Sequence, residues 1–182
     1  MVRRTLLRLL VLIFLLYSLG LSLFSLDGFP QDFQSGQFMP YLADKPVGEV
    51  GYYMLTVAWN IASGQGITYN GGMPTTGIQP LSTFLYAGLA GLARALGGDA
   101  AAFVRLTIFF NALNLLLFAH LVGKIARRLA QRREYEQNAY RWGFLLALFN
   151  FGLFRGFTYG LETGQYLTLL AACILLNWRR EG

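Results

Sequence analysis

The chain has almost no cysteine or histidine and few charges. Of its 182 residues, one is a cysteine, one is a histidine, and 13% are charged. Cys173 alone excludes a disulfide framework or a cysteine metal site within one copy of the chain, and His120 alone makes no metal cluster. P-loop, dinucleotide-binding and nucleophile-elbow motifs are absent as well. The common nucleotide-dependent and serine-hydrolase sites are therefore excluded, and His120 is expected to be a helix-packing residue.

Apolar residues make up 55% of the chain, and its mean hydropathy is positive. A helix crosses the hydrocarbon core of a membrane with roughly 20 residues, or about 17 at the lower limit. The sequence predicts an all-α membrane protein with a single membrane domain over 1–182. Four transmembrane helices are expected at 6–26, 103–122, 142–159 and 161–178. The first apolar run is longer than that of a signal peptide and is expected to be an uncleaved anchor.

The formal net charge of +6 is concentrated beside the predicted helices. Eleven of the fifteen basic residues lie in three flanks: Arg3, Arg4 and Arg8; Lys124, Arg127, Arg128, Arg132, Arg133 and Arg141; and Arg179 and Arg180. The positive-inside rule places all three flanks in the cytoplasm. This pattern predicts a multi-pass protein of the cytoplasmic (inner) membrane with both termini cytoplasmic. It also explains the basic charge without nucleic acid as a partner.

A fifth apolar segment, 80–96, is predicted not to cross the membrane. If it did, the basic segment 124–141 would lie outside, against the positive-inside rule. The segment contains Gly88, Gly91 and Arg94, which suit a helix that lies in the membrane interface or dips in and returns. The loop 27–102 is then extracytoplasmic.

The outer loop carries a second predicted helix, at about 50–63, that is expected to lie at the interface. Apolar residues from Val50 to Ile61 recur at helical spacing, and Gly64 is a natural stop. Asn70 and Gly71 then predict a tight hairpin turn. The loop is therefore expected to hold two interfacial helices against the outer membrane surface, a suitable platform for a lipid-linked substrate.

The loop also carries an ordered motif. It consists of Glu49, Tyr52, Tyr53, Ala58, Asn60, Ile61, Ala62, Gly64, Gly66, Thr68, Tyr69, Thr75, Thr76, Gly77, Gln79, Pro80 and Leu81, and a second motif, GLETGQYLTLLAACILL, begins at Gly160. Together these resemble the N-terminal part of the GT-C superfamily of polytopic membrane glycosyltransferases, which includes bacterial relatives of protein O-mannosyltransferases and aminoarabinose transferases. The resemblance covers nearly the whole chain in order.

The resemblance implies transfer of a sugar from a polyprenyl-phosphate-linked donor to an acceptor on the extracytoplasmic face. An acidic residue of the first outer loop would be catalytic, and Tyr52, Tyr53, Asn60 and Gln79 of the motif would bind substrate. Two departures stand out: Glu49 lies alone where relatives have a pair of acids, and the chain is shorter than such enzymes. The chain is therefore expected to be a fragment, a split subunit that needs a second membrane chain, or a decayed copy.

Glu49 is the leading candidate for the general base, and Glu162 for a second acid that positions the acceptor or a metal ion. Asp44 is the substitute base. Each acid near a helix start also has a structural interpretation, because the helix dipole favours negative charge there. A divalent metal ion stays open as a cofactor, although no metal ligands are assigned.

Arg105 and Arg155 are predicted near the outer ends of their helices, where the positive-inside rule does not favour them. Ionisable residues there are costly unless paired or functional. Both are candidate ligands for the donor phosphate, with Arg94 a weaker candidate. The alternative is that they reach lipid headgroups or pair with nearby acids.

A non-enzymatic membrane subunit or scaffold is the main alternative function. A transporter fragment is a weaker one, because no predicted span carries a charged residue deep inside it.

Overall fold

The computed structural model describes residues 2–23, 47–130 and 132–178. This part of the chain is helical and contains no strand, only an isolated bridge between Thr68 and Pro74. Its helices are α1 (Val2–Ser22), α3 (Glu49–Ala62), α4 (Pro80–Ala95), α5 (Ala100–Leu129), α6 (Arg133–Leu148), α7 (Phe151–Thr158) and α8 (Thr163–Trp178). The expected all-helical class is confirmed.

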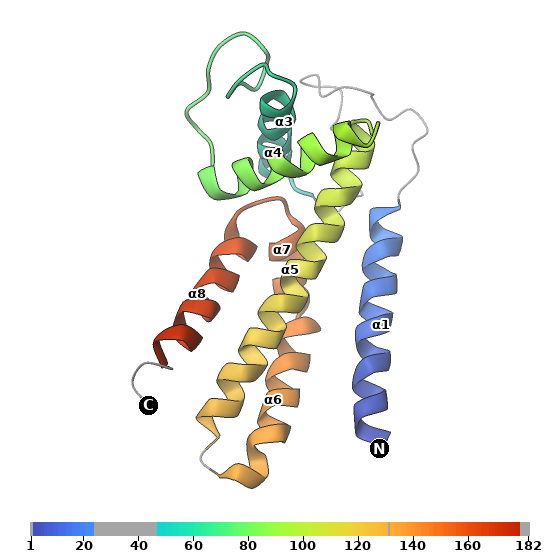
Figure 1. Ribbon diagram of the computed structural model, residues 1–182, viewed down its shortest axis with the longest axis vertical. Coiled ribbons are helices and arrows are strands. Elements are labelled where there is room, and N and C mark those ends of the chain that lie inside the picture. The colour runs from blue at the N-terminus through green and yellow to red at the C-terminus, as the bar shows by residue number, and fades with distance from the viewer. Residues whose placement is uncertain (1, 24–46, 131, 179–182) are drawn as a thin grey trace.

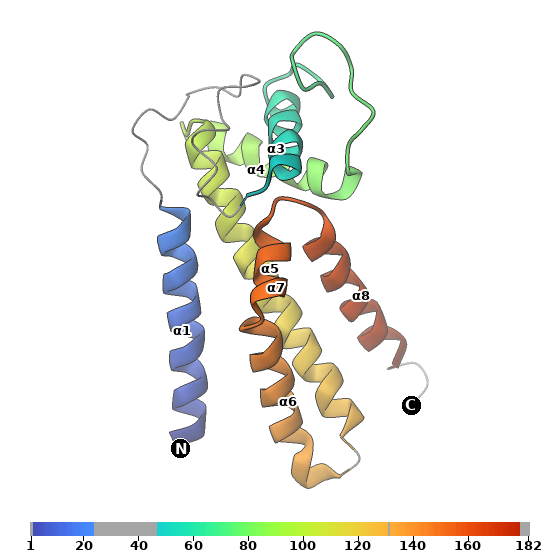
Figure 2. The same cartoon turned by 180° about the vertical axis from the view of Figure 1, so that it is seen from behind.

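The helices form an elongated bundle with a separate head at one end. Figures 1 and 2 show α1, α5, α6 and α8 along the long axis of the molecule, with the head above them. We define the head as residues 47–98, which contain α3, the connecting loop and α4. The start of α1 and the end of α8 lie toward the opposite end of the bundle, as do the end of α5 and the start of α6 (Figure 1).

Of the described helices, two are long and apolar enough to cross a membrane: α1, through residues Thr5–Ser22, and α5. A third crossing is counted if α7 and α8 are taken as one broken segment, although their axes differ by 113°. Taken alone, α4, α6 and α8 are not among these candidates. That 80–96 does not span the membrane stays a prediction, as do the separate spans expected at 142–159 and 161–178. The chain thus has two or three helices that could cross a membrane.

The helix expected over 142–159 is interrupted in the structure. α6 begins earlier, at Arg133, and ends at Leu148, and α7 starts afresh at Phe151. The break occurs because Asn150 takes an extended backbone conformation, and its side-chain oxygen accepts a 2.9 Å hydrogen bond from the Leu153 backbone nitrogen. This is an N-cap, which satisfies one of the free amide groups at the start of a new helix.

The two helices of the head differ in orientation. α4 runs across the end of the bundle, whereas α3 stands along the long axis with its first residue toward the bundle (Figures 1 and 2). The expectation of an interfacial helix at 50–63 with one face in lipid is wrong for α3. Residues 54–60 of α3 are buried on every side of the helix. Protein, not lipid, therefore covers this helix.

Two apolar clusters hold these parts together. In the head, Leu55 and Trp59 of α3 pack with Tyr86 of α4 and with Phe103 and Ile108 of α5. In the bundle, the second cluster joins α1, α5, α6 and α7, and its buried members include Phe14, Leu115, Leu148 and Phe157. α5 contributes to both clusters, so this 30-residue helix is the common support of head and bundle.

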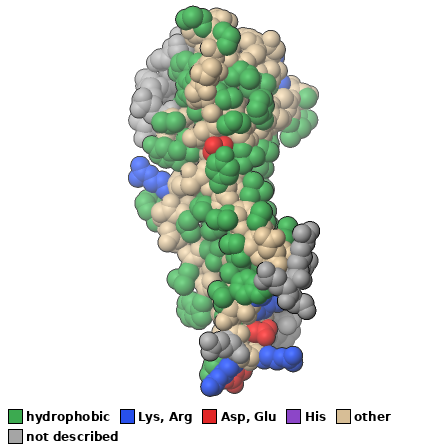
Figure 3. Space-filling model, turned by 90° about the vertical axis from the view of Figure 1, so that its left-hand side faces the viewer, with side chains coloured by type: hydrophobic (Ala, Val, Ile, Leu, Met, Phe, Trp, Pro, Cys, Tyr) green, Lys and Arg blue, Asp and Glu red, His purple; other side chains and the backbone are tan. Residues whose placement is uncertain are grey.

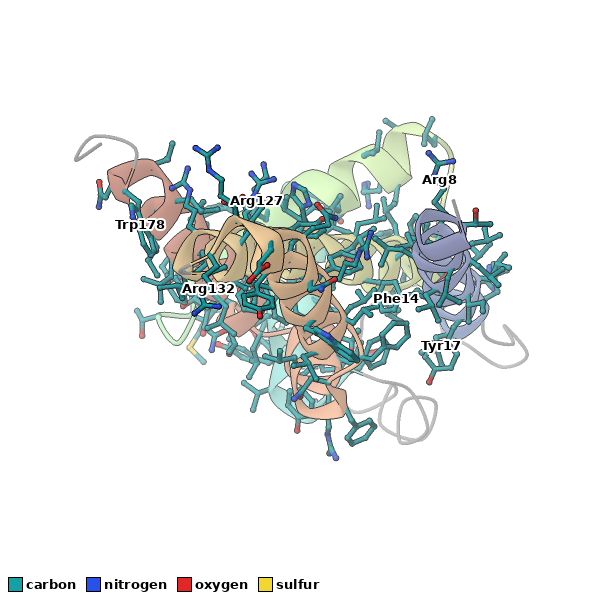
Figure 4. The ribbon with its side chains drawn as sticks, turned by 90° about the horizontal axis from the view of Figure 1, so that it is seen from below. Arg8, Phe14, Tyr17, Arg127, Arg132 and Trp178 are labelled. Carbon is teal, nitrogen blue, oxygen red and sulfur yellow. The ribbon has the colours of Figure 1, made fainter. Side chains whose placement is uncertain are left out.

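Charge separates the two ends of the molecule. Figure 3 shows hydrophobic side chains over most of one face. Most of its basic and acidic side chains gather at the lower end, and others lie in the upper half. Figure 4, viewed from that end, shows Arg8 on α1 and Arg127 and Arg132 around the α5–α6 turn. We call this end, which also carries Lys124, Arg128, Arg133 and Arg141, the basic end.

We expect the head and the basic end to lie in different aqueous compartments. In a Cys173→Ser background, single cysteines placed at Asn70 in the head and at Arg132 in the basic end are treated with a membrane-impermeant maleimide in intact cells. Asn70→Cys should label and Arg132→Cys should label only after the membrane is opened. Equal labelling of both positions in intact cells would contradict this topology.

Candidate functional site

The first turn of α3 touches the turn between α7 and α8. The Gly48 amide donates a 3.0 Å hydrogen bond to the Tyr159 carbonyl oxygen. A Cβ atom on Gly51 would lie 2.1 Å from the same carbonyl oxygen, and one on Gly48 would overlap the Tyr159 ring. Gly160 has a φ of +90°, which suits glycine, and lies against the Gly51 backbone. Only glycines permit so close a backbone contact.

This contact brings the two leading acids to the same region. Glu49 is the first residue of α3, directly between Gly48 and the contact at Gly51; its side chain lies outside the described part of the structure. Glu162 follows Gly160 by two residues, and its carboxylate oxygen Oε2 is buried without a hydrogen-bond partner among the described residues. The backbone thus places both acids at the junction of head and bundle.

Gln79 is the third predicted residue at this junction. It is the residue before α4, and its side-chain oxygen accepts a 3.0 Å hydrogen bond from the Glu162 backbone nitrogen. Its own backbone nitrogen lies 3.4 Å from the Met54 sulfur, inside the head. Gln79 therefore fixes the position of Glu162 relative to α3 and α4.

A buried polar network supports the junction from below. The Tyr86 hydroxyl of α4 and the Asn111 side chain of α5 lie 3.0–3.2 Å apart, and the Gln165 side chain of α8 lies 3.1 Å from the hydroxyl and 3.2 Å from Asn111. All three residues are buried. Because an unsatisfied buried polar group costs about 1–3 kcal/mol, this network specifies how three helices meet.

Two predicted substrate-binding residues instead organise the loop after α3. The Asn60 amide donates to the carbonyl oxygens of Thr68 at 2.8 Å and Tyr69 at 3.2 Å. The Tyr53 ring stacks on Tyr69 with centroids 4.9 Å apart, and its hydroxyl contacts the Thr75 hydroxyl. These contacts hold the loop to α3. Asn60 is also eleven residues beyond Glu49, roughly 16 Å along a helix that rises about 1.5 Å per residue.

The end of α3 and the turn that follows are as the sequence predicts. Gly64 has a φ of +80°, and the amides of Gly64 and Gln65 bond back to the carbonyl oxygens of Ile61 and Asn60, which is a Schellman cap. Gly71 has a φ of +75°, and the Asn70 side chain accepts from the next amides along the turn. The predicted hairpin is reduced to the single bridge described above.

Tyr52 is buried in the head cluster. Burial raises the pKa of its phenol above the ordinary value, because removal from water disfavours the charged form. The hydroxyl therefore stays protonated at physiological pH. It can donate a hydrogen bond but cannot act as a base.

The arginines occupy three different places. Arg155 is exposed on α7, with its guanidinium carbon 6.0 Å from the centre of the Tyr159 ring that lies against Gly48. Arg105 is partly buried in the second turn of α5. Arg94 donates a 2.8 Å hydrogen bond to the Ser63 hydroxyl and lies over Trp59, at the other side of the head. Arg155 therefore lies beside the junction.

Other predicted residues are placed as follows. His120 contacts the Tyr140 hydroxyl at 2.8 Å and packs α5 on α6, which confirms its packing role. Asn111 makes the interhelical hydrogen bonds expected of it, whereas Asn150 caps α7 instead. Asp44 lies outside the described residues. The described residues contain no group of three or more His, Cys, Asp or Glu side chains placed to hold a metal ion.

Sequence reasoning missed the residues that build the junction: Gly48, Gly51, Tyr159 and Gly160. Tyr86 and Gln165, which form the buried network with Asn111, were also missed. The glycines offered a signal, because Gly51 interrupts a predicted helix and Gly160 precedes the second motif. Glycine destabilises the interior of a helix, so a glycine at such a position indicates that another part of the protein packs closely against the backbone there.

Comparison with known proteins returned no match to a family model, to a curated protein or to a solved structure.

We expect Gly51→Ala to destabilise the protein by about 1–3 kcal/mol, the usual cost of forcing extra volume into a packed contact. The new methyl group would press on the Tyr159 carbonyl oxygen. Thermal unfolding of the purified protein in detergent, followed by circular dichroism, measures the change.

Gly88→Ala is the matched control, because a Cβ atom at this position of α4 meets nothing within 4 Å. Alanine is favoured over glycine in a helix by about 0.5–1 kcal/mol, so this variant should unfold at an equal or higher temperature. If Gly51→Ala were as stable as Gly88→Ala, the close contact of α3 with the α7–α8 turn would be wrong.

Proposed function

We propose that this chain is an integral membrane glycosyltransferase, or the N-terminal part or subunit of one. It would transfer a sugar from a polyprenyl-phosphate-linked donor to an acceptor at the extracytoplasmic surface. The observation that carries the proposal is the junction at which the first turn of α3 meets the residues just before Glu162. The likeness of both motifs to GT-C enzymes suggested the chemistry, and each motif supplies one acid to this junction.

In the proposed arrangement four segments cross the membrane: α1, α5, α6 with α7, and α8. The head lies on the extracytoplasmic side and the basic end in the cytoplasm. The positive-inside rule supports this orientation, since basic residues near the start of α1, at the end of α5 and in α6 share one end of the molecule. The position of α4 across the bundle supports a platform at the membrane surface (Figure 1).

In the proposed reaction Glu49 takes the proton from an acceptor hydroxyl as its oxygen bonds to the anomeric carbon of the sugar. The bond from that carbon to the phosphate oxygen breaks, and polyprenyl phosphate leaves with the electron pair. Glu162 would orient the acceptor or a metal ion. Arg155 and Arg105 would stabilise the negative charge on the leaving phosphate, as guanidinium groups do through paired hydrogen bonds.

A non-enzymatic scaffold is the second candidate, and specific contacts favour it. The side chains of three candidate binding residues, Tyr53, Asn60 and Arg94, form hydrogen bonds within the head. These contacts stabilise the head without any contribution from a substrate. In addition, only 17% of the apolar window of α1 is buried. Lipid or the helices of a second membrane chain would cover this surface, as expected of a subunit.

We expect Glu49→Gln to lower sugar transfer by about 100-fold or more, the usual contribution of a positioned general base. The full chain, co-expressed with the reading frames beside it, is reconstituted and offered radiolabelled polyprenyl-phosphate sugars. Transfer of label to the acceptor fraction is measured. Glu162→Gln should lower the rate as well, by less if it only positions the acceptor.

Asp99→Asn is the matched control, because it removes one acidic charge near the head. The Asp99 side chain caps α5 by accepting a 2.9 Å hydrogen bond from the Ala102 amide, and asparagine caps helices as well as aspartate does. This variant should keep full activity. Absence of transfer by the wild-type assembly, with normal assembly of the Glu49→Gln variant, would favour the scaffold instead.

A further inference from the structure

Two grooves flank the N-terminal half of α1 at the basic end. The first lies between α1 and the α5–α6 pair and has a volume of about 520 Å³; the second lies between α1 and α6 and has a volume of about 360 Å³. Leu7 lines both grooves, so they are neighbours on α1. We call them together the α1 grooves.

The grooves lie where the contact of α1 with the bundle is looser. The buried side chains of α1 begin at Phe14, whereas Leu7 and Val11 are only partly buried against the bundle. The Phe14 ring meets the edges of Phe149 and Phe154, with centroids 6.5 and 6.2 Å away, and Tyr17 packs on Phe154 at 5.8 Å. Figure 4 shows Phe14 directed from α1 toward the bundle. Before Phe14, α1 diverges from α6, and this divergence opens the space that the grooves occupy (Figure 2).

The lining combines apolar walls with basic side chains. The walls are mainly leucine, with Val11 and Phe144, and each groove has one arginine: Arg8 in the larger and Arg141 in the smaller. Trp142 lines the smaller groove and is 65% exposed. Tryptophan is enriched where a membrane meets water, so this residue suits the headgroup level.

We propose that the α1 grooves bind one anionic phospholipid, with an acyl chain along the leucine walls and the headgroup phosphate between Arg8 and Arg141. Basic pockets between helices on the cytoplasmic side of a membrane are suited to anionic headgroups, and the basic end carries seven of the fifteen basic residues of the chain. The inference rests on the membrane placement of α1 and α5 and is independent of the enzymatic proposal.

The size of the grooves favours a lipid over a protein occupant. Their volumes fall within the range of roughly 300–1,000 Å³ typical of small-molecule sites. A further helix with its side chains is about 10–12 Å across and needs a longer, wider surface. A second copy of this chain would also bring its own basic end against this one, with like charges opposed.

The test uses Trp142 as the reporter. Trp59→Phe and Trp178→Phe leave Trp142 as the single tryptophan of the full chain, which is then placed in zwitterionic nanodiscs. Phosphatidylglycerol with brominated acyl chains, which quench tryptophan on contact, is titrated in, and brominated phosphatidylcholine is titrated in parallel. The anionic lipid should reach half-maximal quenching at a mole fraction about tenfold lower, as expected for attraction to two nearby arginines.

Arg8→Gln with Arg141→Gln should abolish this preference. Arg132→Gln is the matched control, because Arg132 is exposed at the basic end, 3.7 Å from Glu134, and lines neither groove. It should leave the preference intact. Circular dichroism of both variants confirms that they are folded.

Three results would overturn the proposal. Equal quenching by the two lipids would show that no anionic lipid is selected. An equal loss of preference in Arg132→Gln would show diffuse attraction to the whole basic end. Protection of Trp142 from both brominated lipids, with a dimer in mass measurements of the nanodiscs, would place a second copy in the grooves.

Discussion

The close contact between α3 and the α7–α8 turn determines the rest of the structure. Gly51 and Gly160 let two backbones approach to a distance that any side chain would prevent. The approach sets the height of α3 above the bundle and allows Gly48 to bond to the Tyr159 carbonyl oxygen. Everything proposed for Glu49 and Glu162 depends on it, because these residues are far apart in the chain and this backbone contact brings their segments together.

A set of buried hydrogen bonds holds the contact between α3 and the α7–α8 turn in place. Tyr86, Asn111 and Gln165 bring one helix of the head and two of the bundle to a single buried point. Gln79 adds a hydrogen bond to the Glu162 backbone. An apolar cluster alone would tolerate sliding, since hydrophobic packing is not directional. The polar groups restrict sliding more strongly, because each one loses its hydrogen-bond partner if the helices shift.

Much of this architecture could be predicted from local patterns. The start and end of α3, the Schellman cap at Gly64 and the turn at Asn70 follow from residue type and spacing. The upright, buried position of α3 could not be predicted, because a periodic apolar face does not reveal whether lipid or protein covers it. Nor could the break at Asn150, where one side-chain cap ends an apolar run that would otherwise continue as helix. Local sequence patterns could not predict the contact between Gly51 and Gly160, because these glycines are far apart in the sequence.

The central claim is that the start of α3 and the start of α8 share one end of the molecule. Double electron–electron resonance tests it most directly, with spin labels on cysteines in a Cys173→Ser background reconstituted in lipid. Labels at Val50 and Thr163, both exposed, should give a short distance, because α3 contacts the turn just before Thr163. Labels at Val50 and Arg132 should be separated by on the order of 45 Å, the length of a 30-residue helix such as α5. Similar distances for the two pairs, or a longer one for Val50 and Thr163, would contradict the account.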